Sequence, residues 1–354
     1  MKINIHTGIA GLFLGGAMLL SVAQANAEPL VVNGETISPS ERFDAAKAEG
    51  KLNIFSTYDL APMEAVVAAF KEDTGLEVTH MRLTSGQMFE RVTSEFAANR
   101  LEADYVDLTD LSLVARLVEQ KILEPYKVAS FDDLPPELRA HDGSYYQLMR
   151  SIMVVSVNNA LVEAADTPKS WQDLLDPKFK NVIGMASIDA GGTAFSSYAF
   201  MKEKLGGDYW EKLAAQSPRI YPTATPVMTD IVRGETFLGI NPISLPLSQI
   251  ENGAPITIVY PEEGLPAFPI VGGMTSSAKN KNAAQLFLDW LTSKRGGEVI
   301  ASTAAYALNP QAPAPSFGES ALPSNDQLFN VGEDIWLNQR QSYTEEWRSR
   351  FGTR

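Results

Sequence analysis

Cysteine is absent from the 354-residue chain, and histidine is scarce. Without cysteine the protein has no disulfide bonds, no thiol nucleophile and no cysteine metal ligands, so a sizeable hydrophobic core must stabilise it. The three histidines, His6, His80 and His141, lie far apart in the sequence. Neither an H-x-x-x-H spacing nor a carboxylate–histidine cluster occurs, which argues against a zinc hydrolase and predicts no metal site.

Motifs of catalysis and nucleotide binding are also missing. The sequence contains no G-x-S-x-G elbow, no P-loop and no G-x-G-x-x-G phrase. Asp107 with Asp110, or Glu262 with Glu263, could form an acid–base pair, but solvated acids on an acidic protein are the better interpretation. We therefore predict neither catalytic residues nor a cofactor, and an exported hydrolase is the weakest functional hypothesis.

Positive charge is in short supply, since 29 lysines and arginines face 43 acidic residues and leave a formal net charge of −14. This balance argues against nucleic acid and anionic lipid surfaces as partners. It places no limit on a small ligand, because a local site can oppose the overall sign. Hydrophobic residues make up 45% of the chain, as in ordinary globular proteins, and the length suggests about two domains.

The first 27 residues have the three parts of a cleavable secretory signal. Lys2 precedes an uncharged apolar run over residues 8–22, and Ala25-Asn26-Ala27 supplies the small residues of a cleavage site. The run is shorter than the roughly 20 residues that span a bilayer, which disfavours the alternative of a membrane anchor. We expect a mature chain that starts at Glu28, has no cysteine for a lipid anchor, and is free in the periplasm.

Strand and helix patterns alternate along the remaining chain, which indicates an α/β fold with mainly parallel sheets. A continuous apolar run over residues 152–157 is typical of a strand that is buried on both faces. The other expected strands are residues 51–56, 76–83, 103–108, 181–185, 237–240 and 256–260. The expected helices are residues 62–70, 84–96, 193–200 and 283–300, with a closing helical segment over 326–351. Residues 311–325, rich in proline, serine and alanine, predict an extended connector.

Two loops are built alike, one in each half of the chain. Thr84-Ser85-Gly86-Gln87 and Ala190-Gly191-Gly192-Thr193 each follow a strand and begin a helix. Small residues let a ligand approach the backbone, and the first N–H groups of a helix favour carboxylate or phosphate. Ser56-Thr57, at the end of an expected strand, is a third candidate of this type. The alternative for each loop is plain N-capping, but two such loops together favour binding.

The order of these pieces resembles the periplasmic solute-binding proteins of ABC transporters, extracellular solute-binding family 1. The likeness is strongest to the branch that binds ferric iron, phosphonates and organophosphates. The phrases that carry it cover most of the chain and include KLNIFSTYD at 51–59, TSGQMFERVTSEF at 84–96, ADYVDLTD at 103–110, SWQDLLDPKFKN at 170–181, SIDAGGTAF at 187–195, RGETFLGIN at 233–241, VYPEEG at 259–264 and AKNKNAAQLFLDWLTS at 278–293.

The resemblance implies a type II two-lobed fold with a ligand cleft between the lobes, and a monomer that docks on an inner-membrane permease driven by a cytoplasmic ATPase. We expect lobe 1 to comprise residues 28–152 and about 268–310, and lobe 2 to comprise residues 153–267. Residues 311–354 then form the connector and the C-terminal helical segment.

Ferric-binding relatives have adjacent tyrosines after a cleft asparagine. Here Asn241 is followed by Pro242-Ile243-Ser244, so the tyrosines are missing. The relatives' glutamate would fall near Thr109 or Asp110, and their histidine at Tyr58 or Asp59. Direct Fe³⁺ coordination is therefore disfavoured, since ferric iron needs anionic oxygen ligands. A ferric–anion complex stays as the alternative.

In this resemblance, Gly191-Gly192-Thr193 aligns with the relatives' phosphate-binding helix start. Thr84-Ser85-Gly86 stands where phosphonate- and sugar-phosphate-type relatives favour a serine-threonine-glycine phrase. The resemblance therefore favours a small organic anion such as a phosphonate, a phosphate ester or a carboxylate. The predicted ligand-binding residues are Ser56, Thr57, Thr84, Ser85, Gly86, Gln87, Thr109, Gly191, Gly192, Thr193 and Asn241.

Overall fold

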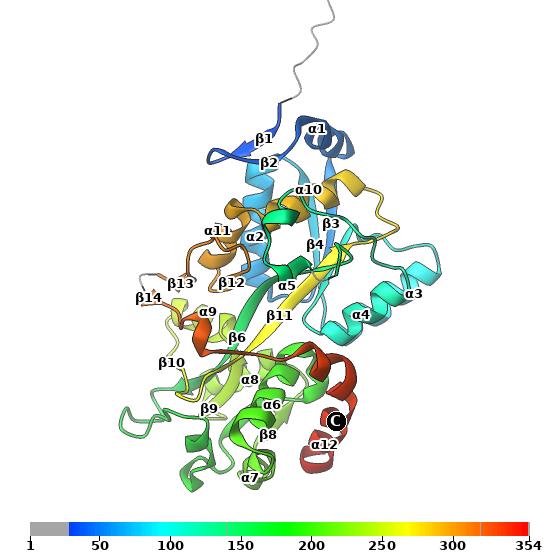
Figure 1. Cartoon of the computed structure of the whole chain (residues 1–354). Coiled ribbons are helices and arrows are strands. Elements are labelled where there is room, and N and C mark those ends of the chain that lie inside the picture. The colour runs from blue at the N-terminus through cyan, green and yellow to red at the C-terminus, as the bar shows by residue number, and fades with distance from the viewer. Residues whose placement is uncertain (1–27, 140, 319, 353–354) are drawn as a thin grey trace, which may run out of the picture.

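The computed structural model describes residues 28–139, 141–318 and 320–352, and Figure 1 shows the course of the chain. The expected signal segment, residues 1–27, lies outside these described residues, so its cleavage stays a prediction. None of the helices in the described part of the chain is both long and apolar enough to cross a bilayer.

Two trios of parallel strands have the same order. In one trio the first strand, β3, lies between β4 and β5, and in the other β7 lies between β8 and β9. The bounds are β3 Lys51–Ser56, β4 Glu77–Arg82, β5 Tyr105–Leu108, β7 Ile183–Ala186, β8 Arg219–Tyr221 and β9 Leu238–Pro242. Strand–helix alternation therefore produced the mainly parallel, two-lobed α/β architecture that the sequence predicts.

Helices surround each trio (Figure 1). Around the first they are α1 Ser40–Glu49, α2 Leu60–Thr74, α3 Ser85–Ala97, α4 Leu111–Glu119, α10 Lys281–Thr292 and α11 Lys294–Ser302. Around the second they are α6 Gly192–Leu205, α7 Tyr209–Ala215, α8 Ala224–Arg233 and α9 Ser244–Glu251, with short 3₁₀ turns η2 Gln172–Leu175, η3 Pro177–Phe179 and η4 Ile188–Ala190. We call the first assembly lobe 1 and the second lobe 2. Smaller elements are the hairpin β1 Leu30–Val32 and β2 Glu35–Ser38, η1 Phe131–Asp133, α5 Pro136–Arg139 and β10 Ile256–Val259.

Two long antiparallel strands, β6 (Tyr146–Asn158) and β11 (Leu265–Met274), run through both lobes (Figure 1). The first half of β6 pairs with β11, which also pairs with β5 of lobe 1, whereas the second half of β6 pairs with β9 and β10. Because β5 runs in the direction of β6 and β9 runs opposite to it, the carboxyl ends of the two trios face each other. The predicted lobe limits at 152/153 and 267/268 fall inside these continuous strands and stay predictions.

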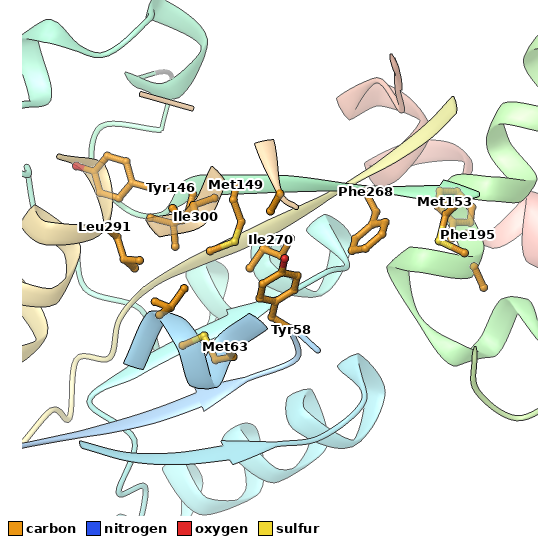
Figure 2. Packing of buried hydrophobic residues seen from close by; sticks show 14 of the residues in the cluster. Tyr58, Met63, Tyr146, Met149, Met153, Phe195, Phe268, Ile270, Leu291 and Ile300 are labelled. Carbon is orange, nitrogen blue, oxygen red and sulfur yellow. The ribbon is translucent and has the colours of Figure 1, made fainter. Parts of the chain in front are cut away.

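The hydrophobic core is continuous between the lobes along these strands. Figure 2 shows Phe268 of β11 between Ile270 on the lobe 1 side and Phe195 on the lobe 2 side, and all three side chains are buried. The apolar residues 152–157 are buried along the length of β6, as the continuous hydrophobic run predicts. The two lobes therefore share the strands and part of the core that join them.

Residues 283–300 form two helices, so the prediction of one helix was wrong. α10 ends at Thr292, and α11 begins after Ser293, whose hydroxyl accepts the Gly296 N–H at 3.1 Å. A Cβ at Gly296 would lie 2.1 Å from the Trp290 carbonyl oxygen, so glycine permits this close turn. The amphipathic period continues through the break because both helices present their apolar faces to lobe 1.

The C-terminal region also differs from the expected single helical segment. Its elements are β12 Tyr306–Ala307, the hairpin β13 Ser316–Phe317 with β14 Ser320–Ala321, the 3₁₀ turn η5 Asn325–Gln327, β15 Leu328–Asn330, the π-helical turn η6 Ile335–Gln339 and α12 Arg340–Phe351. β15 pairs in parallel with β11, so part of the predicted helix is a strand. Tertiary pairing along β11 outweighs local preference here.

A buried carboxylate, Asp104, ties three segments of lobe 1 together. It accepts hydrogen bonds from the backbone and side-chain amides of Asn53 and Asn280 and from the backbone N–H of Lys279, at 2.8–3.0 Å. Its exposed fraction is 0%. This one side chain joins β3, the start of β5 and the turn before α10.

Replacing Asp104 with alanine should lower the free energy of unfolding by about 3–5 kcal/mol, because it leaves one buried and two partly buried backbone N–H groups without acceptors. Urea unfolding followed by tryptophan fluorescence measures the change. Asp132→Ala, at an exposed position, is the control and should stay within about 0.5 kcal/mol of the unmodified protein. Equal stability of the two variants would show that the Asp104 bonds contribute no net stability.

Candidate functional site

A cavity of about 40 Å³ lies where the carboxyl ends of the two strand trios face each other. Segments that follow all six parallel strands line it, and Phe268 of the crossing strand β11 adds an apolar wall. From lobe 1 come Thr57, Tyr58, Asp59, Arg82, Thr84, Ser85 and Thr109, and from lobe 2 come Ala190, Thr193, Thr223, Ala224, Thr225, Pro242 and Leu245. The cavity is thus at the position where open α/β sheets bind ligands.

Three helices begin at the wall of this cavity. Thr84 precedes α3, Thr193 lies in the first turn of α6, and Thr223 precedes α8. The first N–H groups of each helix have no partner within the helix, and the helix dipoles add partial positive charge. This arrangement suits a bound anion, and it draws donors from both lobes.

One cation and one acid occur among the described residues that line the cavity, Arg82 and Asp59. Their side chains lie 3.4 Å apart, and Arg82 is 34% exposed. Asp59 also accepts a hydrogen bond from the Ser244 hydroxyl of lobe 2. Burial raises the pKa of Asp59, against the opposing effects of Ser244 and Arg82. The pair leaves the site near neutral, so the helix ends and the guanidinium must supply the attraction for an anion.

Five of the eleven predicted ligand-binding residues line the cavity, namely Thr57, Thr84, Ser85, Thr109 and Thr193. Thr57 is the most suggestive of them, because its hydroxyl is buried and has no hydrogen-bond partner in the described structure. A buried hydroxyl without a partner is costly unless a ligand or water completes it. The unpartnered Thr57 hydroxyl therefore favours a ligand or water in the cavity that Thr57 lines.

Three of the other predicted residues, Ser56, Gln87 and Asn241, have structural contacts instead. Ser56 is buried and donates to Asp107 at 2.9 Å, and the amide oxygen of Gln87 accepts from the Thr84 hydroxyl at 3.0 Å, so plain capping explains Gln87. Asn241 is buried in β9 and donates to Ser156. Gly86 has open space around its Cα. None of these four lines the cavity.

Gly191 and Gly192 also do not line the cavity, because the opposite lobe occupies the space in front of them. A Cβ at Gly192 would lie 1.6 Å from the carbonyl oxygen of Thr109, and one at Gly191 would lie 3.3 Å from the Ser85 hydroxyl. Ser85 and Thr109 are themselves joined by a hydrogen bond of 2.9 Å. Small residues here allow the approach of lobe 1, whereas the sequence pattern predicted the approach of a ligand.

The interpretation of Asp107 and Asp110 as solvated acids was wrong, since both are buried. Asp107 accepts from the Ser56 hydroxyl and from the Thr57 N–H at 3.0 Å, which fixes the loop that lines the cavity. Burial raises its pKa to about 6. Glu263 likewise accepts the Trp171 N–H at 2.9 Å. Each of the three acids accepts a hydrogen bond from a backbone N–H, and none of them lines the cavity.

Two features of the cavity wall were not predicted from the sequence, namely the third helix start, Thr223-Ala224-Thr225, and the charged pair of Asp59 and Arg82. A signal for the helix start was present, because Thr223 follows a strand and Pro226 lies in the first turn of the helix, where proline is tolerated. Arg82 carries no local signal, since an arginine at a strand end is common on surfaces.

Comparison with known proteins identifies the family. The family model described as bacterial extracellular solute-binding protein matches residues 52–303. The chain belongs to this family. A putative 2-aminoethylphosphonate-binding periplasmic protein of Salmonella typhimurium is 27% identical to this solute-binding protein over 238 residues, which cover 64% of this chain and 67% of the relative. The Fe(3+)-binding periplasmic protein of Serratia marcescens is 25% identical over 274 residues, covering 74% and 79%.

A solved structure with the same fold is the periplasmic binding protein AfuA from Actinobacillus pleuropneumoniae, which holds fructose-6-phosphate. Its TM-score is 0.73 at 23% identity, and the match covers 86% of this chain and all of AfuA. The predicted type II fold is thereby confirmed. The protein is a solute-binding component of an ABC-type importer, a family of transport proteins that bind a small solute and dock on a permease, and its relatives are periplasmic. In the described ranges, no three His, Asp or Glu side chains gather where they could hold a metal ion.

Gly192→Ala should prevent full closure of the lobes, because its Cβ would overlap the Thr109 carbonyl. The backbone of Gly192 accepts alanine without strain, so folding should be retained. Small-angle X-ray scattering should show a larger radius of gyration than for the unmodified protein. Gly86→Ala, in α3 with free space around it, is the matched control and should leave the radius unchanged while stabilising the helix by about 0.5–1 kcal/mol. Equal radii for both variants would contradict the assigned lobe contact.

Asp107→Asn should change how stability depends on pH. The raised pKa of Asp107 means that the folded state binds a proton between about pH 4 and pH 6 that the unfolded state releases, so the free energy of unfolding falls as pH rises through this window. The Asp107→Asn variant lacks this pH-dependent contribution to the free energy of unfolding. Its stability relative to the unmodified protein should therefore rise by about 3 kcal/mol between pH 4 and pH 8, as measured by urea unfolding. A difference that is constant with pH would show that Asp107 is not the titrating group.

Proposed function

We propose that the protein captures a small anionic solute in this cavity and delivers it to a membrane permease. The solute is of phosphonate, phosphate ester or carboxylate type. The observation that carries the proposal is the convergence of three helix starts, from α3, α6 and α8, with the guanidinium of Arg82 on one small cavity. Helix N-termini and a guanidinium each attract an anion, and here they lie around the same cavity.

The chemistry of the residues that line the cavity narrows the choice of solute further. Thr57, Thr84, Ser85, Thr109 and Thr193 line the cavity with hydroxyl groups. The Thr84 hydroxyl donates to Gln87, and one hydroxyl of the Ser85–Thr109 pair donates to the other, so the Thr57 hydroxyl is the clearest donor for an acid oxygen. Asp59, beside Arg82, offers a carboxylate to a cationic group on the same solute. The cavity volume of about 40 Å³ favours a compact solute. The names of the Salmonella relative and of the AfuA complex, a phosphonate and a sugar phosphate, agree with an anion of this class.

A ferric–anion complex is the second candidate, supported by the Serratia relative named as Fe(3+)-binding. Tyr58 and Asp59 are the two side chains of the cavity wall that could offer anionic oxygen. Burial raises the pKa of the Tyr58 phenol well above its usual value, so this group stays protonated. One carboxylate is a weak ligand set for Fe³⁺, which places the organic anion first. Exported enzymatic activity ranks last, because the described residues that line the cavity include no histidine, lysine or cysteine to act as a base or a thiol nucleophile.

Thermal-shift measurements test the ligand class with inorganic phosphate, 2-aminoethylphosphonate, fructose 6-phosphate, citrate and ferric citrate. A solute at about 100 times its dissociation constant stabilises the folded protein by about 2.7 kcal/mol. We expect at least one phosphonate, phosphate ester or carboxylate to stabilise the protein without iron. Stabilisation by ferric citrate alone, with a coloured protein, would replace the first proposal by the second.

Arg82→Gln should weaken binding of the stabilising anion by about 30- to 100-fold, because it removes a charge-assisted hydrogen bond in a partly buried site. Isothermal titration calorimetry gives the dissociation constants. Arg100→Gln, which removes the same charge from an exposed position of lobe 1 outside the cavity wall, should change affinity less than threefold. Equal losses in the two variants would show that only the overall charge matters, and would place the solute elsewhere.

A further inference from the structure

The C-terminal helix α12 is fixed to lobe 2. Its Trp347 is buried against Tyr198 of α6, with ring centroids 5.5 Å apart, and Tyr343 donates a hydrogen bond to Glu203 of the same helix. Arg348 forms an ion pair of 2.6 Å with Asp189 of η4. Figure 1 shows α12, in red, against lobe 2 and below α4 of lobe 1. Residues from 304 onward, which include α12, lie outside the family match.

One residue of this helix reaches across to lobe 1. Arg340, the first residue of α12, places two of its nitrogens 3.0 and 2.9 Å from the same carboxylate oxygen of Asp110. On the lobe 2 side its guanidinium lies 4.4 Å from the ring centroid of Phe195 in α6 and donates to Thr344 at 2.7 Å. The Asp110 side chain is 2% exposed and that of Arg340 is 20% exposed, so water screens this pair weakly.

Asp110 is also next to a close backbone contact between the lobes. It directly follows Thr109, whose carbonyl oxygen faces Gly192 and whose side chain lines the cavity. The other carboxylate oxygen of Asp110 accepts from the backbone and hydroxyl of Ser112, which fixes the carboxylate on the first turn of α4. A rigid acceptor on lobe 1 therefore meets a rigid donor on lobe 2 at the edge of the cavity.

We propose that Arg340 is a latch that stabilises the closed arrangement of the two lobes through Asp110. Opening the cleft separates α4 from α12, so it breaks the two hydrogen bonds and exposes a charge pair that is shielded when the lobes are closed. The latch regulates the cavity discussed above and so rests on the proposed capture of a solute by closure. Its test needs no solute, which keeps the two proposals separable.

The absence of cysteine allows a direct measurement of lobe separation. Glu90→Cys on α3 and Glu211→Cys on α7, both exposed, place one spin label on each lobe. Pulsed electron paramagnetic resonance then gives the distribution of distances in the unliganded protein. We expect Arg340→Gln to lower the ratio of closed to open molecules by about tenfold, the effect of one charged hydrogen-bonded pair.

Three further variants distinguish a latch from a general structural role. Asp110→Asn keeps the Ser112 contact but loses the charge, and it should open the lobes as much as Arg340→Gln. The double variant should open them no further, because both changes remove the same interaction. Arg348→Gln breaks an ion pair inside lobe 2 and should leave the distances unchanged. The same distance distribution in the unmodified protein and in Arg340→Gln would overturn the latch, and so would equal opening by Arg348→Gln.

Discussion

The antiparallel pairing of β6 with β11 is the constraint on which the rest of the structure depends. Each strand contributes to both lobes, and each pairs with the last strand of one parallel trio. Three successive antiparallel pairings, β5 with β11, β11 with β6 and β6 with β9, reverse the direction of one trio relative to the other. The carboxyl ends of six strands therefore meet in one region, and the helices that follow them begin there. The position of the cavity therefore follows from the strand topology and does not depend on which side chains line it.

Closure depends on how near two backbones can come. The carbonyl of Thr109 lies against Gly192, where even one methyl group would overlap it, and Gly191 lies against Ser85. The lobes therefore meet at the start of α6, beside the cavity that its Thr193 lines. The same few residues serve two purposes, since the glycines admit the opposite lobe while Thr193 lines the space that is left. A small cavity with dense polar donors follows from this close approach.

Much of the fold was predictable from the sequence because its signals are local. Strand runs such as residues 51–56 and 152–157, and the helix patterns between them, depend on apolar period, which is set by burial on one or two faces. The predictions of secondary structure were wrong where a tertiary contact decided the conformation of the segment. β15 is a strand because β11 offers it a partner, and the break at Ser293 becomes visible only with the close contact of Gly296. The site was half predictable, since threonines at helix starts are recognisable, whereas Arg82 and Asp59 have no pattern of their own.

The sequence by itself determined the alternation of strands and helices, the lack of thiol and histidine chemistry, and the resemblance to solute-binding proteins. Those properties depend on composition and on spacing along the chain. Only the tertiary structure decided that Gly191 and Gly192 face the other lobe, that Asp107 and Asp110 are buried, and that Arg340 meets a carboxylate 230 residues away. The reason is physical: burial and ion pairing depend on which distant segments meet, and that is fixed by the packing of two lobes around two shared strands.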